Sequence, residues 1–203
     1  MMAWTGWTYI VSPADIDETP LPGEEPSAYV SRLAVSKARA VPPARGGAFI
    51  VAADTIVVDG GDLLGKPANP EDAAAMLTRL RGRSHQVYTA IAVRDAEERL
   101  EADLCVTQVP MRAYSNSEIE SYVASGDPLD KAGAYAIQNR EFHPVENFSG
   151  CYASVAGLPI CHLLRTMRKW DMDCETSIPA ACLVYLDYAC PVSAAILRGE
   201  NAG

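Results

Sequence analysis

Two long apolar runs near the middle of the chain constrain its fold most strongly. Residues 86–93 and 100–109 are rich in the residue types that favour strands, and a short charged segment, residues 94–99, separates them. Apolar runs joined by so short a polar connection are typical of neighbouring antiparallel strands. We therefore predict that the two runs pair with each other as an antiparallel hairpin.

Signals for further strands and for helices lie on both sides of this hairpin. Two β-rich pieces, residues 49–53 and 56–58, precede a turn at Gly60-Gly61 and a return run that ends at residue 64. Caps, first-turn prolines and apolar residues at helical spacing predict helices over residues 26–40, from residue 69 onward, over 115–124 and, interrupted at Pro159, over 155–170. Helices and strands alternate, with antiparallel pairs among them, which predicts a mixed α/β (α+β) domain.

The charge and composition of the chain exclude several classes of function. Its 203 residues include 17 Lys and Arg against 26 Asp and Glu, a net charge of −9, whereas nonspecific binding to nucleic acid or anionic membranes relies on a basic surface. Hydrophobic residues make up 49% of the chain, which is enough for one good-sized core. No apolar run reaches the ~20 residues of a membrane helix and no signal peptide is indicated, so we expect a cytoplasmic protein without nucleic-acid or membrane partners.

The cysteines gather towards the C-terminus, since all but Cys105 follow residue 150. The others are Cys151, Cys161, Cys174, Cys182 and Cys190. Metal ligands usually come as close pairs such as C-x-x-C, and none is present, so reduced thiols are favoured over a zinc or iron–sulfur site and over disulfides. Residues 171–203, which hold three of these cysteines, are interpreted as an appended C-terminal tail.

The segment that points most directly to chemistry is Asp54-Thr55, between the two β-rich pieces. A carboxylate in this context either caps a turn at the end of a strand or lies buried and paired at a pocket. Four other charged residues stand where the chain gives little local reason for them: Glu18, Lys37, Lys66 and Lys131. Lys66 follows a glycine and precedes a proline, a stiff turn suited to presenting charge to phosphate, although each lysine alone is more typical of a solvated surface.

Eight short motifs occur in the order and spacing of one known family. They include Asp-Ile-Asp-Glu at 15–18, Ala-Asp-Thr at 53–55, Gly-Lys-Pro at 65–67 and Asp-Lys-Ala-Gly-Ala-Tyr-Ala-Ile-Gln at 130–138, with further matches at 29–38, 72–77, 82–89 and 157–159. Together they resemble the Maf family of nucleoside triphosphate pyrophosphatases, also known as septum formation proteins. The resemblance implies a catalytic domain at residues 1–170 with an inosine-triphosphatase-like fold, an elongated mixed β-sheet flanked by helices with a central cleft. It also implies hydrolysis of a nucleoside triphosphate to the monophosphate and pyrophosphate with a divalent metal cation, Mg²⁺ or Mn²⁺.

The same resemblance implies roles for individual residues. Asp54 matches the proton acceptor that activates water, and Glu18 matches an acidic residue that would hold the metal with Asp54. The substrate-binding matches are Lys37 and Lys66 for the phosphates, Lys131, and Thr55 and Gln138 for the base. The Asp-Thr pair is similar to the branch that acts on dTTP and UTP rather than on 7-methyl-GTP, with a house-cleaning role towards modified pyrimidine nucleotides and a link to cell-division arrest.

One family feature is missing ahead of the first motif. Family members begin with a strand that leads into a Ser-x-Ser-Pro-Arg-Arg segment, whereas only 14 residues precede Asp15 and none supplies that segment. Residues 6–10 resemble the opening strand of the family. Either the start codon is placed too late, or the chain is truncated and acts as a catalytically impaired nucleotide-binding or division-regulating protein. A homodimer is common for cytoplasmic enzymes of this size.

Overall fold

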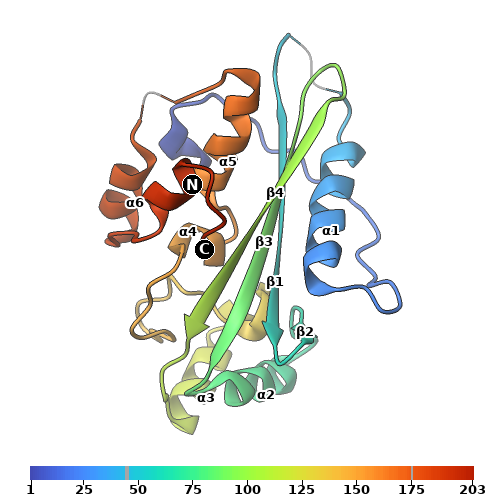
Figure 1. The fold of residues 1–203 in the computed structure, drawn as a ribbon. Helices are drawn as coiled ribbons and strands as arrows, with labels where there is room; N and C mark the ends of the chain where they lie inside the picture. Colours follow the sequence, from blue (N-terminus) through green and yellow to red (C-terminus); the bar gives the residue numbers. More distant parts are fainter. Residues whose placement is uncertain (44–45, 175) are drawn as a thin grey trace.

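The chain folds into a central sheet with helices on both of its faces, as Figure 1 shows for the computed structural model. The structure describes residues 1–43, 46–174 and 176–203. The strands are β1 (Ile50–Asp59), β2 (Asp62–Leu64), β3 (Ser84–Arg94) and β4 (Leu100–Pro110). The helices are α1 (Pro26–Ala40), α2 (Pro70–Leu80), α3 (Asn116–Ala124), α4 (Tyr152–Val155), α5 (Ile160–Met167), α6 (Ile178–Leu186) and α7 (Ser193–Leu197). Short 3₁₀ segments are η1 (Met2–Thr5), η2 (Asp127–Asp130), η3 (Ala132–Ala134) and η4 (Arg168–Trp170). The expected mixture of helices and strands is confirmed.

The strands form one sheet in the order β2-β1-β3-β4. The predicted hairpin is confirmed, because β3 and β4 pair antiparallel along their whole length, from Ser84 opposite Pro110 to Arg94 opposite Leu100. The pairings of β1 with β2 and with β3 are antiparallel as well. The sheet is therefore antiparallel at each of these pairings, whereas the sequence reasoning expected a mixed sheet.

Strand β1 is continuous through Asp54 and Thr55, so the interpretation of two separate strands with a turn-capping aspartate is wrong. Asp54 lies opposite Ala90 and Thr55 opposite Thr89, in uninterrupted register with β3. The pairing with β3 supplies the local backbone with partners, which is why a carboxylate in mid-strand does not end the strand. Successive side chains of a strand point to opposite faces, so Asp54 and Thr55 lie on different sides of the sheet.

Helix α1 covers one face of the sheet. Its buried residues Val30, Ala34 and Ala38 pack with Ile56 and with apolar residues of β3. Pro26 at the start of the helix needs no N–H partner there, and the apolar residues recur at helical spacing, as the sequence predicts. This packing holds the C-terminal turn of α1, which carries Lys37, against the middle of β1.

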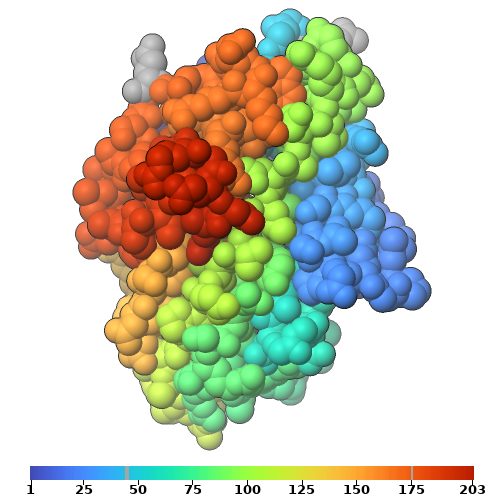
Figure 2. Space-filling view, viewed as in Figure 1, coloured from blue at the N-terminus to red at the C-terminus, as the bar shows by residue number. Residues whose placement is uncertain are grey.

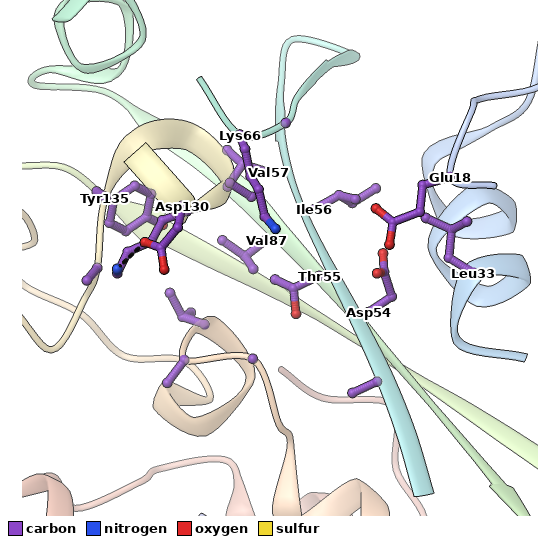
Figure 3. Close-up of a pocket in the computed structure, with 18 of the residues that line it drawn as sticks. Glu18, Leu33, Asp54, Thr55, Ile56, Val57, Lys66, Val87, Asp130 and Tyr135 are labelled. Atoms are coloured by element: carbon purple, nitrogen blue, oxygen red, sulfur yellow. Dashed lines mark hydrogen bonds and ion pairs between the residues drawn. The ribbon is translucent and has the colours of Figure 1, made fainter. Parts of the chain in front are cut away.

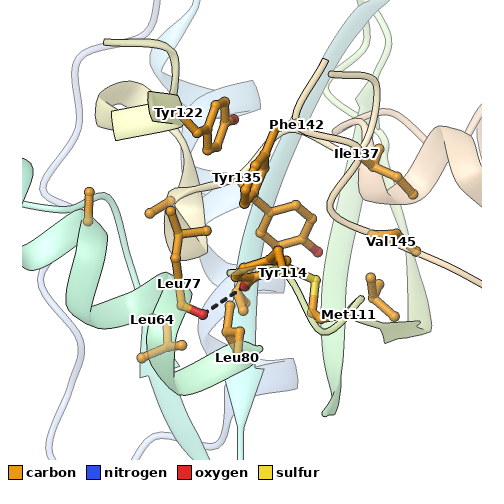
Figure 4. Packing of buried hydrophobic residues seen from close by; sticks show 14 of the residues in the cluster. Leu64, Leu77, Leu80, Met111, Tyr114, Tyr122, Tyr135, Ile137, Phe142 and Val145 are labelled. Carbon is orange, nitrogen blue, oxygen red and sulfur yellow. Dashed lines mark hydrogen bonds between the residues drawn. The ribbon is translucent and has the colours of Figure 1, made fainter. Parts of the chain in front are cut away.

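Helices α2 and α3 enclose a second core at the end of the sheet (Figure 4). Leu77, Leu80 and the fully buried Tyr114 lie in this core, and the Tyr114 hydroxyl donates to the Leu77 carbonyl at 2.7 Å. Both predicted helix starts are confirmed. The Asn69 side chain caps α2, and Ser115 forms the capping box of α3.

The C-terminal residues pack against the rest of the chain and form a continuous surface with it in Figure 2. Ile178 of α6 and Ile196 of α7 are 1% and 0% exposed, in one cluster with Ile160 and Leu164 of α5. The helix expected over residues 155–170 is confirmed only in part, since residues 156–159 separate α4 from α5 around the predicted interruption at Pro159. The boundary placed at residue 170 stays a prediction. Among the described residues, no helix has both the length and the apolar character needed to cross a membrane.

The strand expected over residues 6–10 is absent from the described structure. Gly6 adopts a left-handed conformation with φ 75° and ends η1. The Trp7 indole then donates to the Asp173 carbonyl at 3.4 Å, while Ile10 and Val11 are 91% and 83% exposed. Contacts with the C-terminal region, rather than pairing with the sheet, therefore place this segment.

Candidate active site

A cavity of about 520 Å³ lies around the middle of β1. Its walls come from α1, from β1, from the turn after β2, from the segment around η3 and from the end of α4. All seven residues singled out from the sequence line it: Glu18, Lys37, Asp54, Thr55, Lys66, Lys131 and Gln138. In Figure 3 the two acidic residues lie on one side of β1 and Thr55 on the other. The cavity thus reaches both faces of the sheet.

The cavity reaches both faces because part of one edge of β1 is open. Strand β3 pairs with β1 over residues 50–58, whereas β2 pairs only with residues 57–59. On this edge, residues 50–56 have no strand partner among the described residues. A ligand that passes over this edge can contact Asp54 and Thr55 together.

On the α1 side, one lysine joins two carboxylates. Lys37 Nζ lies 2.6 Å from Asp54 Oδ1 and 2.7 Å from Glu18 Oε1. The Asp54 side chain is only 9% exposed, while that of Glu18 is 53% exposed. The Tyr29 hydroxyl donates to the Glu18 carbonyl at 2.7 Å and so fastens the acidic loop to α1.

The surroundings shift the pKa values of this pair in the same direction. Burial raises the pKa of Asp54 above its ordinary value, and the hydrogen bond and charge of Lys37 offset only part of that rise. For Lys37, burial disfavours the ammonium, but the hydrogen bonds to Asp54 and Glu18 outweigh it and raise the pKa. Lys37 is therefore a fixed cation, and Asp54 is a carboxylate with an increased tendency to take up a proton.

Two further lysines enter the cavity in different states. Lys66 is exposed and makes no ion pair with the described residues. Its charge offsets a small part of the rise that burial causes in the pKa of Asp54. Lys131 is already engaged, because its Nζ lies 2.6 Å from Asp130 Oδ1 and donates to the Asp127 carbonyl at 2.9 Å. Lys66 is thus the lysine whose charge is more available to a ligand.

Thr55 lies on the other side of β1, and Gln138 lines the same cavity. The Thr55 hydroxyl is 3.0 Å from that of Thr89, and Thr89 donates to the Ser154 carbonyl at 2.9 Å. Gln138 is exposed on the segment that follows η3. Sequence reasoning gave no role to Thr89 or Ser154. For Thr89, the one hint in the sequence was its position as a polar residue inside the apolar run that forms β3.

Two carboxylates in this cavity are suitable for a divalent cation. Glu18 and Asp54 converge on a single cationic atom, Lys37 Nζ, so they already share a position that favours positive charge. Mg²⁺ is commonly held by one or two carboxylates plus substrate phosphates and water. Within the described residues, no group of three or more His, Cys, Asp or Glu side chains is arranged for a metal. The cysteines, at residues 105, 151, 161, 174, 182 and 190, are all free thiols.

The family model described as Maf-like protein matches residues 1–170. The chain belongs to the Maf-like family. Among the relatives of this Maf-like chain, a dTTP/UTP pyrophosphatase of Myxococcus xanthus is 50% identical over 79% of the chain and 81% of that protein. A dTTP/UTP pyrophosphatase of Geobacter sulfurreducens is 43% identical over 83% of the chain and 89% of that protein. One from Thermomicrobium roseum is 40% identical over 100% of the chain and 92% of its own length. The last of these Maf-like relatives is matched beyond residue 170 as well.

Proposed function

We propose that this Maf-like protein hydrolyses dTTP and UTP to the nucleoside monophosphate and pyrophosphate. The names of three relatives, at 40–50% identity, support this reading. The observation that carries it is the position of Asp54, a buried carboxylate paired with Lys37 in the same cavity as Thr55 and Gln138. One ligand can therefore contact a base, a fixed cation and two polar groups suited to a pyrimidine.

In the proposed reaction, Asp54 acts as the general base. The oxygen of a water molecule attacks the α-phosphorus, and the bond from this phosphorus to the oxygen that bridges the α- and β-phosphates breaks. Asp54 accepts the proton that the water loses, and pyrophosphate leaves. Lys37 donates to Oδ1, and Oδ2 accepts no hydrogen bond from the described residues, so Oδ2 is the atom that takes the proton.

The lysines supply positive charge where the phosphates gain negative charge. Lys37 is held beside Asp54 and therefore close to the α-phosphate. Lys66, exposed in the cavity and with no ion pair among the described residues, is suited to the departing pyrophosphate. Lys131 shares its charge with Asp127 and Asp130, so we assign it to binding rather than to the transition state.

Glu18 and Asp54 are the residues that would hold a divalent cation, Mg²⁺ or Mn²⁺. When bound, such a cation neutralises charge on the phosphate oxygens. The phosphates and water would complete its ligands, because the protein offers two carboxylates here. The substrates are intracellular nucleotides, which agrees with the cytoplasmic location that the sequence leads us to expect.

Turnover by the full chain tests the proposal. Release of pyrophosphate from dTTP, UTP and 7-methyl-GTP is measured with Mg²⁺ or Mn²⁺, using inorganic pyrophosphatase and a phosphate stain. We expect turnover of dTTP and UTP, and a decrease of about 10²- to 10⁴-fold in Asp54→Asn, since general-base catalysis contributes about that factor. Asp62→Asn is the matched control, because Asp62 is exposed on β2 and pairs with Arg79 outside the cavity.

The possible results separate the alternatives. Full turnover in Asp54→Asn would show that another group activates water. Nucleotide binding without turnover by the wild-type chain would identify an impaired, nucleotide-binding member of the family. A preference for 7-methyl-GTP would contradict the assignment of Thr55 and Gln138 to a pyrimidine.

A further inference from the structure

A hydrogen-bonded series of three groups leads from the cavity into the core behind it. The series runs from the Thr55 hydroxyl to the Thr89 hydroxyl, 3.0 Å away, and from there to the Ser154 carbonyl, 2.9 Å away. Thr89 is 0% exposed, in the middle of β3 and directly opposite Thr55 in the sheet. The hydrogen bond to Thr55 links this buried residue to the cavity.

In both hydrogen bonds of this series, chemistry fixes which group is the donor and which is the acceptor. A carbonyl oxygen can only accept, so Thr89 must donate its single hydroxyl proton to Ser154. The Thr89 oxygen is then an acceptor, and Thr55 must donate to it. Thr55 has no second proton, so it offers only lone pairs to a ligand.

The Ser154 carbonyl, at the buried end of this series, has both of its acceptor positions filled. The Ser154 carbonyl also accepts the Gly157 N–H at 2.8 Å, so both of its lone pairs are used. Gly157 lines the cavity beside Thr55, because a Cβ added to this glycine would lie 3.9 Å from Thr55 Oγ1. The carbonyl that orients Thr89 therefore belongs to the same turn that forms the cavity wall.

We propose that Thr89 is a positioning residue that sets which pyrimidine this protein accepts. This inference rests on the proposed function. Uracil and thymine carry an N–H donor at ring position 3, where cytosine carries an acceptor. A Thr55 hydroxyl restricted to accepting pairs with the N3–H of uracil or thymine and opposes the N3 lone pair of cytosine. Gln138, whose amide both donates and accepts, cannot make this distinction alone.

Two substitutions at Thr89 separate this role from simple packing. Thr89→Val keeps the shape of the side chain but removes the hydroxyl, so the Thr55 hydroxyl is free to rotate and donate. The Ser154 carbonyl keeps its bond from Gly157, which leaves the buried carbonyl with a partner in this variant. Thr89→Ser keeps the hydroxyl and removes a methyl group, so it is the matched control.

The readout is the ratio of kcat/KM for dTTP to that for dCTP in the full chain. We expect Thr89→Val to lower this ratio about tenfold, the size of a hydrogen bond mismatched in a partly buried site. Thr89→Ser should keep the ratio within about threefold of wild type. An equal loss of activity on both nucleotides in Thr89→Val would indicate a packing role and overturn the inference. An equal fall of the ratio in Thr89→Ser would overturn it too.

Binding keeps this test separate from that of the proposed function. The affinities of non-hydrolysable α,β-imido analogues of dUTP and dCTP are measured by calorimetry for wild type and both variants. If the wild-type chain hydrolyses neither nucleotide but its affinity ratio falls in Thr89→Val and persists in Thr89→Ser, the inference stands and the proposed function fails. If turnover of dTTP is normal and neither ratio changes in Thr89→Val, the function stands and the inference fails.

Discussion

Replacing Lys37 by methionine should expose the unequal strength of its two ion pairs. The substitution leaves Asp54, 9% exposed, without its cationic partner. A hydrogen bond between charged groups contributes about 1.5–3 kcal/mol, and removing one partner of a fully buried pair costs about 3–5 kcal/mol. Because Lys37 itself is 21% exposed, we expect Lys37→Met to lower the free energy of unfolding by about 2 kcal/mol at pH 7.

The second ion pair provides the matched control. Glu18 is 53% exposed, so Glu18→Gln should lower the free energy of unfolding by less than about 1 kcal/mol. The double variant Lys37→Met, Asp54→Asn should be more stable than Lys37→Met alone, because the buried amide carries no charge. The double-mutant cycle consists of wild type, Lys37→Met, Asp54→Asn and the double variant. Urea denaturation followed by tryptophan fluorescence gives their four free energies of unfolding.

The pH dependence of this destabilisation checks its cause. An unpaired Asp54 is costly only while it is ionised, so the difference between wild type and Lys37→Met should shrink as the pH falls. Burial raises the pKa of Asp54 in the folded chain, so this change begins above the ordinary value of 3.8. Additive effects of the Lys37 and Asp54 substitutions, or a cost in Glu18→Gln equal to that in Lys37→Met, would refute the reasoning.

Three further predictions concern the cavity and its supports. Gly133 has φ +68°, and a Cβ there would lie 2.9 Å from Val57, so Gly133→Ala should cost about 2–4 kcal/mol of stability by urea denaturation. Gly126→Ala, at φ +76° with open space around it, should cost only about 1 kcal/mol, and equal costs would contradict the clash. Lys66→Ala should lower kcat and kcat/KM for dTTP about tenfold while stability stays within about 0.5 kcal/mol, and an unchanged kcat would exclude a role with the departing pyrophosphate. The raised pKa of Asp54 makes protonation of this base easier, so kcat/KM should fall as the pH drops through that pKa. If the residual activity of Asp54→Asn falls over the same pH range, the fall belongs to another group.

Local signals in the sequence predicted the elements whose stability is also local. The hairpin of β3 and β4 follows from two apolar runs and a short connection, and the starts of α2 and α3 follow from capping residues within three positions. The residues alone suggested a pocket at Asp54, but the meeting of Glu18 and Asp54 was predicted only through the resemblance, because no spacing in the sequence shows that they meet at Lys37. That meeting depends on α1 packing against β1.

Long-range contacts account for what the sequence did not predict. Strand β1 continues through Asp54 because its backbone there pairs with β3. In the sequence, the polar residues Asp54 and Thr55 interrupt the apolar run, so the pattern does not show this pairing. The residues after 170, interpreted as an appended tail, form α6 and α7, and Ile178 and Ile196 of these helices are buried in one cluster with residues of α5. Thr89 and Ser154 are 65 positions apart in the chain, so their hydrogen bond is apparent only in the fold.

The alternation of side chains along β1 separates two properties that neighbouring codons encode. A substitution at Thr55 changes the wall on one face of the sheet and leaves the ion pairs of Asp54 on the other face untouched. Under the proposed function, substrate preference can therefore diverge among descendants of such a protein by single replacements at Thr55 without loss of the reaction itself. An insertion or deletion of one residue within β1 would instead exchange the two faces and remove both properties at once.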